Sequence, residues 1–354
     1  MNKFKRAMYK LFIEGLSGMA LGLFATLIIG TILLQISSVI PGRAGELLFI
    51  VAKIAMSLTG AGIGVGVAYK FKEAPLVVIS AAAAGQIGAF AAKILAGTVF
   101  TDGVIIYAGP GEPLGAFLAA YTAITIGHHV SGKTKVDILV TPICCIASGM
   151  IVGLLLGPPI SAFMTSLGAL VNWGTEQQPV LMGIIVSVLM GIFLTLPISS
   201  AAIGIILNLS GVAAGAAAVG CCSNMIGFAV ASYRENKIGG LLAQGLGTSM
   251  IQMPNIVKKP LIWLPAIITS AILGPISTAV LGMTNNATGS GMGTAGLVGP
   301  IMAFQTMVET QSAGMALTQI IIMLFILPAI CAFGISEFMR KKGWIKDGDM
   351  KLDI

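Results

Sequence analysis

Charged side chains are too few in this chain to cover a water-exposed surface. Only 9% of its 354 residues are Asp, Glu, Lys or Arg, whereas 56% are hydrophobic. An ordinary soluble domain is about 25% charged, so this composition excludes a soluble globular protein. It also excludes intrinsic disorder, because disordered chains are poor in hydrophobic residues. The apolar runs have the length that membrane-spanning helices need. The sequence therefore predicts an all-α, polytopic membrane protein.

The apolar runs predict about ten transmembrane helices. Each span needs about 20 apolar residues, which leaves no room for a soluble domain, so residues 1–354 are expected to form a single transmembrane domain. The expected spans are 11–40, 47–69, 75–97, 114–127, 136–157, 179–207, 209–233, a segment that begins at residue 260 and meets Gly274-Pro275, 296–308 and 314–334.

Proline and glycine predict where some of these helices break. Gly157-Pro158-Pro159 is expected to end a helix, so that 160–173 becomes a re-entrant or interfacial segment. The glycines, glutamines and prolines of 238–257 favour a broken helix. Residues 133–200 and 257–310 share the same order of features, which suggests a weak internal repeat. Each begins with basic residues, which are followed by an apolar helix, a Gly-Pro pair and a polar break. Recurring Gly-Pro bends in unrelated helices are the simpler alternative.

The positions of the basic residues predict the topology. Cytoplasmic loops of membrane proteins are enriched in Lys and Arg. One arrangement puts 15 of the 20 Lys and Arg residues on the cytoplasmic side, together with both chain ends. These residues are Lys3, Lys5, Arg6, Lys10, Lys70, Lys72, Lys133, Lys135, Lys258, Lys259, Arg340, Lys341, Lys342, Lys346 and Lys351.

Four short motifs in the second half resemble a known family. They are KPLIWLP at 259–265, SAILGPI at 270–276, Asn285-Asn286 and GMGTAGLVG at 291–299. In these motifs, and along nearly its whole length, the chain resembles the membrane family classed with the sugar-permease (EIIC) component of the bacterial phosphotransferase system. Some members of that family are named as regulators of perfringolysin production. The resemblance implies a homodimer in the bacterial inner membrane.

The chain departs from a working phosphotransferase permease in one respect. Such a permease needs partner domains with His and Cys phospho-acceptors, and no soluble segment here is long enough to be one. Either those partners are separate EIIA and EIIB proteins, or this branch keeps the fold without phosphorylation. No catalytic residue is predicted, and the chain is at most the membrane subunit of a sugar phosphotransferase system.

Two carboxylates and an amide are candidates for solute binding. Glu112 lies in GPGEP at 109–113, where prolines and glycines prevent a regular helix, so its carboxylate could accept hydrogen bonds from sugar hydroxyls or pair with a lysine. Glu176 and Gln177 follow an apolar segment and offer the carboxylate and amide groups that form hydrogen bonds with a hydroxylated solute. A solvated loop is the alternative for both sites.

The polar, glycine-rich break after residue 283 completes the predicted binding site. Broken helices expose backbone donors and acceptors at membrane depth, where transporters bind their solutes. The predicted residues here are Asn285, Asn286, Gly291 and Gly293, which lie within the stretch of backbone up to residue 293.

Cofactor and metal sites are not expected. GMGTAG at 291–296 has the spacing of a dinucleotide-binding motif, but it follows no strand. His128 and His129 have no further ligands at helical spacing and suit a membrane interface. The five cysteines lie in apolar runs as two adjacent pairs and a single residue, without the C-x-x-C spacing, so they are expected to be packing residues.

Two functions remain open from the sequence. The first is a permease-like transporter of a small hydroxylated solute, a sugar by the resemblance, that alternates access around the broken segments. The second is a membrane sensor or regulator that binds a solute without transporting or phosphorylating it. A scaffold without a ligand is the remaining alternative. The expected partners are membrane lipid, a second copy of the chain, a small-molecule solute and separate phosphotransferase proteins, but no nucleic acid.

Overall fold

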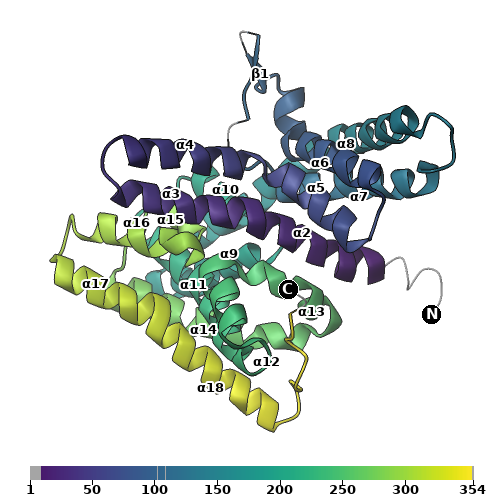
Figure 1. The fold of residues 1–354 in the computed structure, drawn as a ribbon. Helices are drawn as coiled ribbons and strands as arrows, with labels where there is room; N and C mark the ends of the chain where they lie inside the picture. The colour runs from purple at the N-terminus through teal and green to yellow at the C-terminus, as the bar shows by residue number, and fades with distance from the viewer. Residues whose placement is uncertain (1–8, 102, 108, 353–354) are drawn as a thin grey trace. The chain divides into compact units, whose positions relative to one another are not determined.

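The computed structural model describes residues 9–101, 103–107 and 109–352 (Figure 1). In this part of the chain the regular structure is helical, apart from one antiparallel pair of short strands, β1 (Phe100–Thr101) and β2 (Val104–Ile105). The predicted all-α class is confirmed. The chain divides into two compact units, Met1–Phe163 and Met164–Ile354, which are described in turn. Of the predicted cytoplasmic basic residues, Lys3, Lys5 and Arg6 lie outside the described residues.

The first unit is built around a long N-terminal helix and the helices that pack on it. Its elements are η1 (Lys10–Gly15), α2 (Leu16–Leu23), η2 (Phe24–Ile28), α3 (Ile29–Val39), α4 (Arg43–Ser57), α5 (Thr59–Lys70), α6 (Pro75–Leu95), α7 (Pro113–Val130) and the first part of α8 (Asp137–Thr175). Gly18 and Gly22 of α2 meet Gly66 and Gly62 of α5 backbone to backbone, since a Cβ at any of them would overlap the facing chain. Small residues at this spacing allow such close contact.

The second unit is built around the antiparallel pair α9 and α14 and the central helix α11. Its helices are α9 (Pro179–Thr195), α10 (Ser200–Ile206), α11 (Gly211–Ala231), α12 (Tyr233–Leu242), η3 (Ala243–Gly247), η4 (Ser249–Gln252), α13 (Met253–Lys258), η5 (Pro260–Trp263), α14 (Leu264–Pro275), η6 (Ile276–Leu281), α15 (Ala287–Ser290), η7 (Ala295–Leu297), α16 (Val298–Met307), α17 (Ala313–Ile321), η8 (Ile322–Ile326) and α18 (Leu327–Lys341). Among the candidate membrane spans α11 is the most completely buried.

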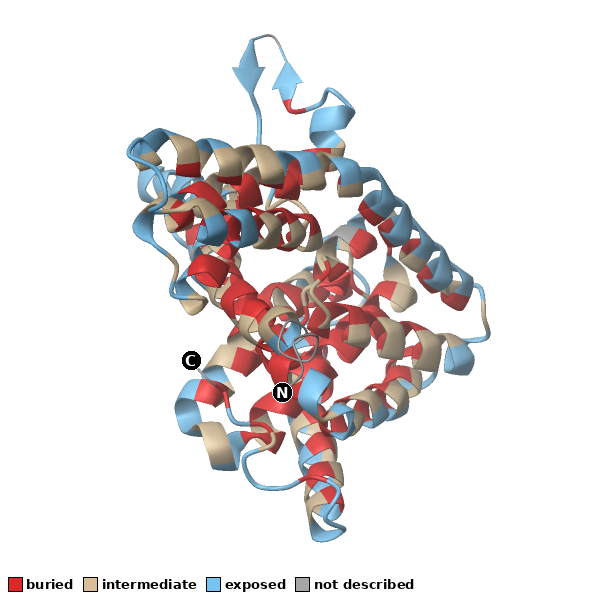
Figure 2. Cartoon of the chain, turned by 90° about the vertical axis from the view of Figure 1, so that its right-hand side faces the viewer, coloured by how far each residue is buried: buried red, intermediate tan, exposed pale blue. Residues whose placement is uncertain are grey.

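Six helices in the described residues are long and apolar enough to cross a membrane, or seven if the bent pair α4 and α5 is one span. Two shorter apolar helices, Pro179–Thr195 and Ala295–Met307, add to these. Large apolar side chains such as Ile79, Leu155 and Val280 are exposed, as is expected of helices that contact lipid. Figure 2 shows that exposed residues recur along the helices. The chain is therefore polytopic, and about ten predicted spans correspond to fewer long helices and several short ones.

The predicted helix end at Gly157-Pro158-Pro159 is wrong. Helix α8 continues through both prolines to Thr175, so 160–173 is its last part and not a separate segment. A proline in a helix removes one backbone hydrogen bond and favours a bend, but the remaining bonds can carry the helix past it. The helix likewise continues past Gly274-Pro275, where α14 runs directly into the π-helical η6.

The broken helix predicted for 238–257 is confirmed. This stretch contains the end of α12, the π-helical η3, the 3₁₀-helical η4 and the short α13. Lys237, just before it, has a positive φ of 52°, which is uncommon for a residue with a side chain. Buried amide side chains replace the missing helical hydrogen bonds here, since Gln244 donates to Gly240 O at 2.9 Å and to Ser232 Oγ at 2.8 Å.

Candidate functional site

An irregular, buried segment follows η6 in the second unit, and we call residues 282–297 the broken segment. It begins at Gly282, whose left-handed conformation (φ 57°) ends η6. Asn285 then forms an isolated antiparallel bridge with Gly211, in which its N–H donates to Gly211 O at 3.1 Å. After the four-residue α15, Gly293 and Gly296 again have positive φ angles. Glycine adopts these angles without the steric cost that a Cβ brings.

The broken segment lies beside the middle of α11. The Cys221 thiol, near the centre of that helix, donates to Ser290 O at 3.6 Å. From α10, Ser200 Oγ donates to Gly291 O at 2.6 Å. A Cβ added to Gly293 would lie 3.0 Å from the Cys221 backbone. The second unit therefore places non-helical backbone halfway along a buried, apolar span, which is tolerated only where protein or an aqueous cavity surrounds it.

Both predicted asparagines shape this segment. Asn285 is fully buried, and its Nδ2 donates to Gly299 O at 3.1 Å while its Oδ1 accepts from the Asn286 N–H at 2.9 Å. Asn286 is half-buried and caps α15 by accepting from the Gly289 N–H at 2.9 Å. The Asn285 amide is thus committed to holding the loop, whereas the Asn286 side chain is partly accessible.

Glu176 and Gln177 lie in the turn between α8 and α9. Glu176 is exposed, and half-buried Gln177 donates through Nε2 to Trp173 O at 3.0 Å. Thr278 of η6 donates to Pro179 O at 2.6 Å, which ties the start of α9 to the end of η6. The turn and the start of the broken segment therefore lie at the same end of the antiparallel pair formed by α9 and α14.

Glu112 belongs to the first unit, where it caps α7. Its backbone N–H donates to Ala89 O of α6 at 2.8 Å, and its carboxylate accepts a long hydrogen bond of 3.5 Å from the Leu114 N–H. Gly111 precedes it with a φ of 75° and lies so close to Ala89 that a side chain would collide. Burial raises the pKa of Glu112 to about 7, although the hydrogen bond from Leu114 lowers it. Its charge therefore changes near neutral pH.

The structure brings only part of the predicted site together. Asn285, Asn286, Gly291 and Gly293 share the broken segment, and Glu176 and Gln177 lie at the same end of the second unit as its first residues. Glu112 lies in the other unit. That all seven residues bind a solute is a proposal.

The sequence did not predict a polar centre on α11. Asn224 is fully buried, and its Oδ1 accepts from Trp263 Nε1 at 2.9 Å and from Thr195 Oγ1 at 3.3 Å. Its Nδ2 donates to Ser270 Oγ at 3.2 Å and to Gly220 O at 3.2 Å. These bonds join α9, α11, η5 and α14. An asparagine inside an apolar span is costly unless it has such partners, and that signal could have identified it.

A second polar contact that the sequence did not predict lies in the first unit. His128 Nδ1 lies 3.0 Å from Glu73 Oε2, and Lys10 Nζ lies 3.9 Å from Glu73 Oε1. In the described residues no three His, Cys, Asp or Glu side chains are placed to hold a metal ion. The five cysteines are free thiols and form no disulfide.

Comparison with known proteins identifies the family. The family model described as "Phosphotransferase system, EIIC" matches residues 13–352. No curated protein matches the chain. Because the match covers nearly all residues, the chain belongs to the phosphotransferase system EIIC family and is a membrane component of the sugar-permease type.

Proposed function

From this family membership, we propose that the chain binds a small hydroxylated solute, most simply a sugar, and carries it across the bacterial inner membrane. The broken segment is the main structural support for this proposal, because its irregular backbone lies beside the middle of α11. Peptide groups at this depth can replace the water that a solute loses on entering the membrane. Discontinuous helices supply solute sites in other transporters for the same reason.

The polar side chains around the break supply specificity. The accessible part of Asn286 and the backbone at Gly291 and Gly293 form one side of the proposed site. Glu176 and Gln177 contribute from the start of α9. In the first unit, Glu112 is proposed separately as a carboxylate that accepts hydrogen bonds from solute hydroxyl groups, because a half-buried carboxylate needs donors that protein or ligand must supply.

Phosphorylation and assembly complete the proposal. We propose that phosphoryl transfer to the solute comes from separate EIIA and EIIB proteins, as the EIIC family match suggests. We propose a homodimer with both chain ends in the cytoplasm, where Lys133, Lys135, Lys258 and Lys259 also lie. The weak internal repeat of 133–200 and 257–310 is part of the same proposal. In both copies the helix runs past its Gly-Pro step before a polar break.

Uptake by reconstituted vesicles tests transport. Purified protein is placed in vesicles, and radiolabelled sugars are offered with and without EIIA and EIIB proteins and a phosphoryl donor. We expect accumulation of one sugar class that requires the phosphotransferase proteins. Binding without uptake under both conditions would favour the sensor, and the absence of both binding and uptake across the sugar classes would contradict the proposed function.

A further inference from the structure

The C-terminal residues 346–352, which we call the tail, pack into the second unit instead of extending away from it. Met350 is completely buried and Leu352 is 8% exposed. They lie against the stretch from Ser232 to Lys259, which we call the tail groove. This stretch contains the broken helix formed by η3, η4 and α13. The tail therefore covers a part of the chain that has few helical hydrogen bonds of its own.

Amide side chains of the groove bind the main chain of the tail. Met350 O accepts from Asn236 Nδ2 at 2.8 Å and from Gln252 Nε2 at 3.0 Å. Lys351 O accepts from Asn255 Nδ2 at 2.8 Å. The Leu352 N–H donates to Asn236 Oδ1 at 2.8 Å. Four hydrogen bonds to three consecutive residues hold the tail much as a bound peptide is held.

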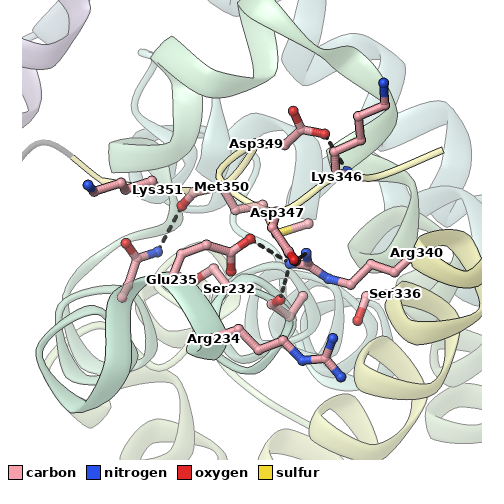
Figure 3. Close-up of polar contacts among 12 residues, drawn as sticks. Ser232, Arg234, Glu235, Ser336, Arg340, Lys346, Asp347, Asp349, Met350 and Lys351 are labelled. Atoms are coloured by element: carbon pink, nitrogen blue, oxygen red, sulfur yellow. Dashed lines mark hydrogen bonds and ion pairs between the residues drawn. The ribbon is translucent and has the colours of Figure 1, made fainter. Parts of the chain in front are cut away.

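Ion pairs fix the tail at its other end. Arg340 on α18 donates to Glu235 at 2.8 Å and to Asp347 at 3.1 Å (Figure 3). Lys259 Nζ lies 2.6 Å from Asp349 Oδ2. Burial raises the pKa of Asp349, but the hydrogen bond from Lys259 and that from the Lys346 N–H outweigh it, so the net shift is downward. The Asp349 carboxylate is therefore held in its charged form.

The groove connects the tail to the broken segment through two amides. Gln252, which binds Met350 O, also donates to Gln244 Oε1 at 3.0 Å. Gln244 belongs to η3, where the neighbouring Gly245 O accepts from Thr294 Oγ1 at 2.5 Å. Thr294 is a fully buried residue of the broken segment. Hydrogen bonds, joined by the covalent step from Gln244 to Gly245, thus connect Met350 of the tail to Thr294 of the broken segment.

The groove is not fully packed beside the tail. An open cavity of about 410 Å³ is lined by Glu235, Asn236, Gly239, Gly240, Lys351 and Leu352. The adjacent Lys237 has the positive φ described above. Open space and a strained backbone are features of segments that open locally.

We propose that the tail is a releasable strap that keeps the broken segment closed while it is docked. In the docked state, Gln252 and Gln244 hold η3 in place, and η3 holds Thr294. When the tail leaves, Gln252 loses Met350 O as an acceptor, the contact between Gln252 and Gln244 loosens, and the broken segment gains freedom to move. The regulatory meaning of the strap rests on the proposed function, but its mechanics can be tested without any solute.

The test uses the full chain in mild detergent and two readouts. Hydrogen exchange of amides 347–352 reports tail release. The rate at which a maleimide modifies Cys221, located by mass spectrometry, reports opening of the broken segment, because that buried thiol donates to Ser290 O of the segment. Cys145 in the first unit is the internal reference.

A charge reversal and its rescue form the variant series. Lys259→Asp places two carboxylates together and should release the tail, and Lys259→Asp with Asp349→Lys should dock it again. In the single variant we expect Cys221 modification to become roughly five- to tenfold faster, the effect of losing about one net hydrogen bond. The rates of the double variant should return toward the parent's. Lys351→Ala is the matched control, since it leaves the Lys351 carbonyl in place.

Two results would overturn the strap. Fast exchange of the tail amides in the parent protein would show that the tail is not docked. An unchanged Cys221 rate in a single variant whose tail amides exchange faster would show that the tail and the broken segment are not coupled. Loss of solute uptake has no part in either result, so failure of the strap and failure of the proposed function are distinguishable.

Discussion

The completely buried Asn224 side chain accepts a hydrogen bond of 2.9 Å from the indole Nε1 of Trp263, 39 residues further along the chain. Replacing Asn224 with Ala leaves that indole, Thr195 and Ser270 short of a partner. We expect a loss of about 1–3 kcal/mol in the free energy of unfolding, measured as a lower melting temperature in detergent. Ser223→Ala on the same helix is the control, because the buried Ser223 hydroxyl has no hydrogen-bond partner in the described residues. Equal melting temperatures for both variants would show that the Asn224 bonds contribute no net stability.

The proposed function predicts that both candidate carboxylates matter for solute binding. Glu112→Gln and Glu176→Gln each remove an acceptor charge, and losing one charge-assisted hydrogen bond costs about 1.5–3 kcal/mol. Solute binding should therefore weaken by roughly one to two orders of magnitude, with expression and dimerisation intact, as measured by calorimetry or scintillation proximity. Glu309→Gln, in an exposed turn after α16, is the control. The site assignment is wrong if both variants bind as tightly as the parent.

The raised pKa of Glu112, about 7 instead of 4.5, predicts a pH dependence of binding. Below pH 7 the carboxyl group is mostly neutral and accepts weaker hydrogen bonds from hydroxyl groups. Affinity should therefore fall by up to about tenfold between about pH 8 and pH 6. The effect of pH on the free energy of unfolding has the opposite direction. Because the pKa of Glu112 is raised in the folded protein, its contribution to stability is present at low pH and is lost as the pH rises through about 7. Binding by Glu112→Gln should vary little over this range, and a full pH response in that variant would assign the titration to another group.

Because the broken segment is closely packed, we expect Gly291→Ala to impair both solute binding and stability. A Cβ at Gly291 would overlap the backbone of Ser200, so either α10 or the broken segment must shift. We expect solute binding to be largely lost, with a lower melting temperature. Gly334→Ala in α18, where a Cβ meets open space, should instead stabilise the helix by about 0.5–1 kcal/mol. Normal binding by Gly291→Ala would place the solute elsewhere.

The distribution of basic residues predicts the orientation. A reporter fused after Ile354 and a membrane-impermeant label at Lys133 should both report the cytoplasmic side. A label at Lys93, near the end of α6, should report the opposite side, because α6 is a candidate membrane span. Periplasmic labelling of Lys133 would reverse the proposed topology.

The amino-acid sequence alone determined the class of the molecule and most of its long helices. Apolar runs and scarce charge predict an all-α membrane protein, because the bilayer imposes a length and a polarity on every spanning segment. The broken stretch 238–257 was also predictable, since its glycines and prolines act on the backbone where they occur.

Tertiary structure decided which polar residues are available to a solute. From the sequence, Asn285 and Glu176 were equally good candidates for solute binding. In the structure, Asn285 is buried and hydrogen-bonded within the broken segment, whereas Glu176 is exposed. Packing also carried α8 past Gly157-Pro158-Pro159 and docked Met350 against Asn236 and Gln252, about 100 residues away in the chain. Contacts between residues this far apart depend on which helix faces meet in space. The hydropathy of a segment says only how apolar that segment is.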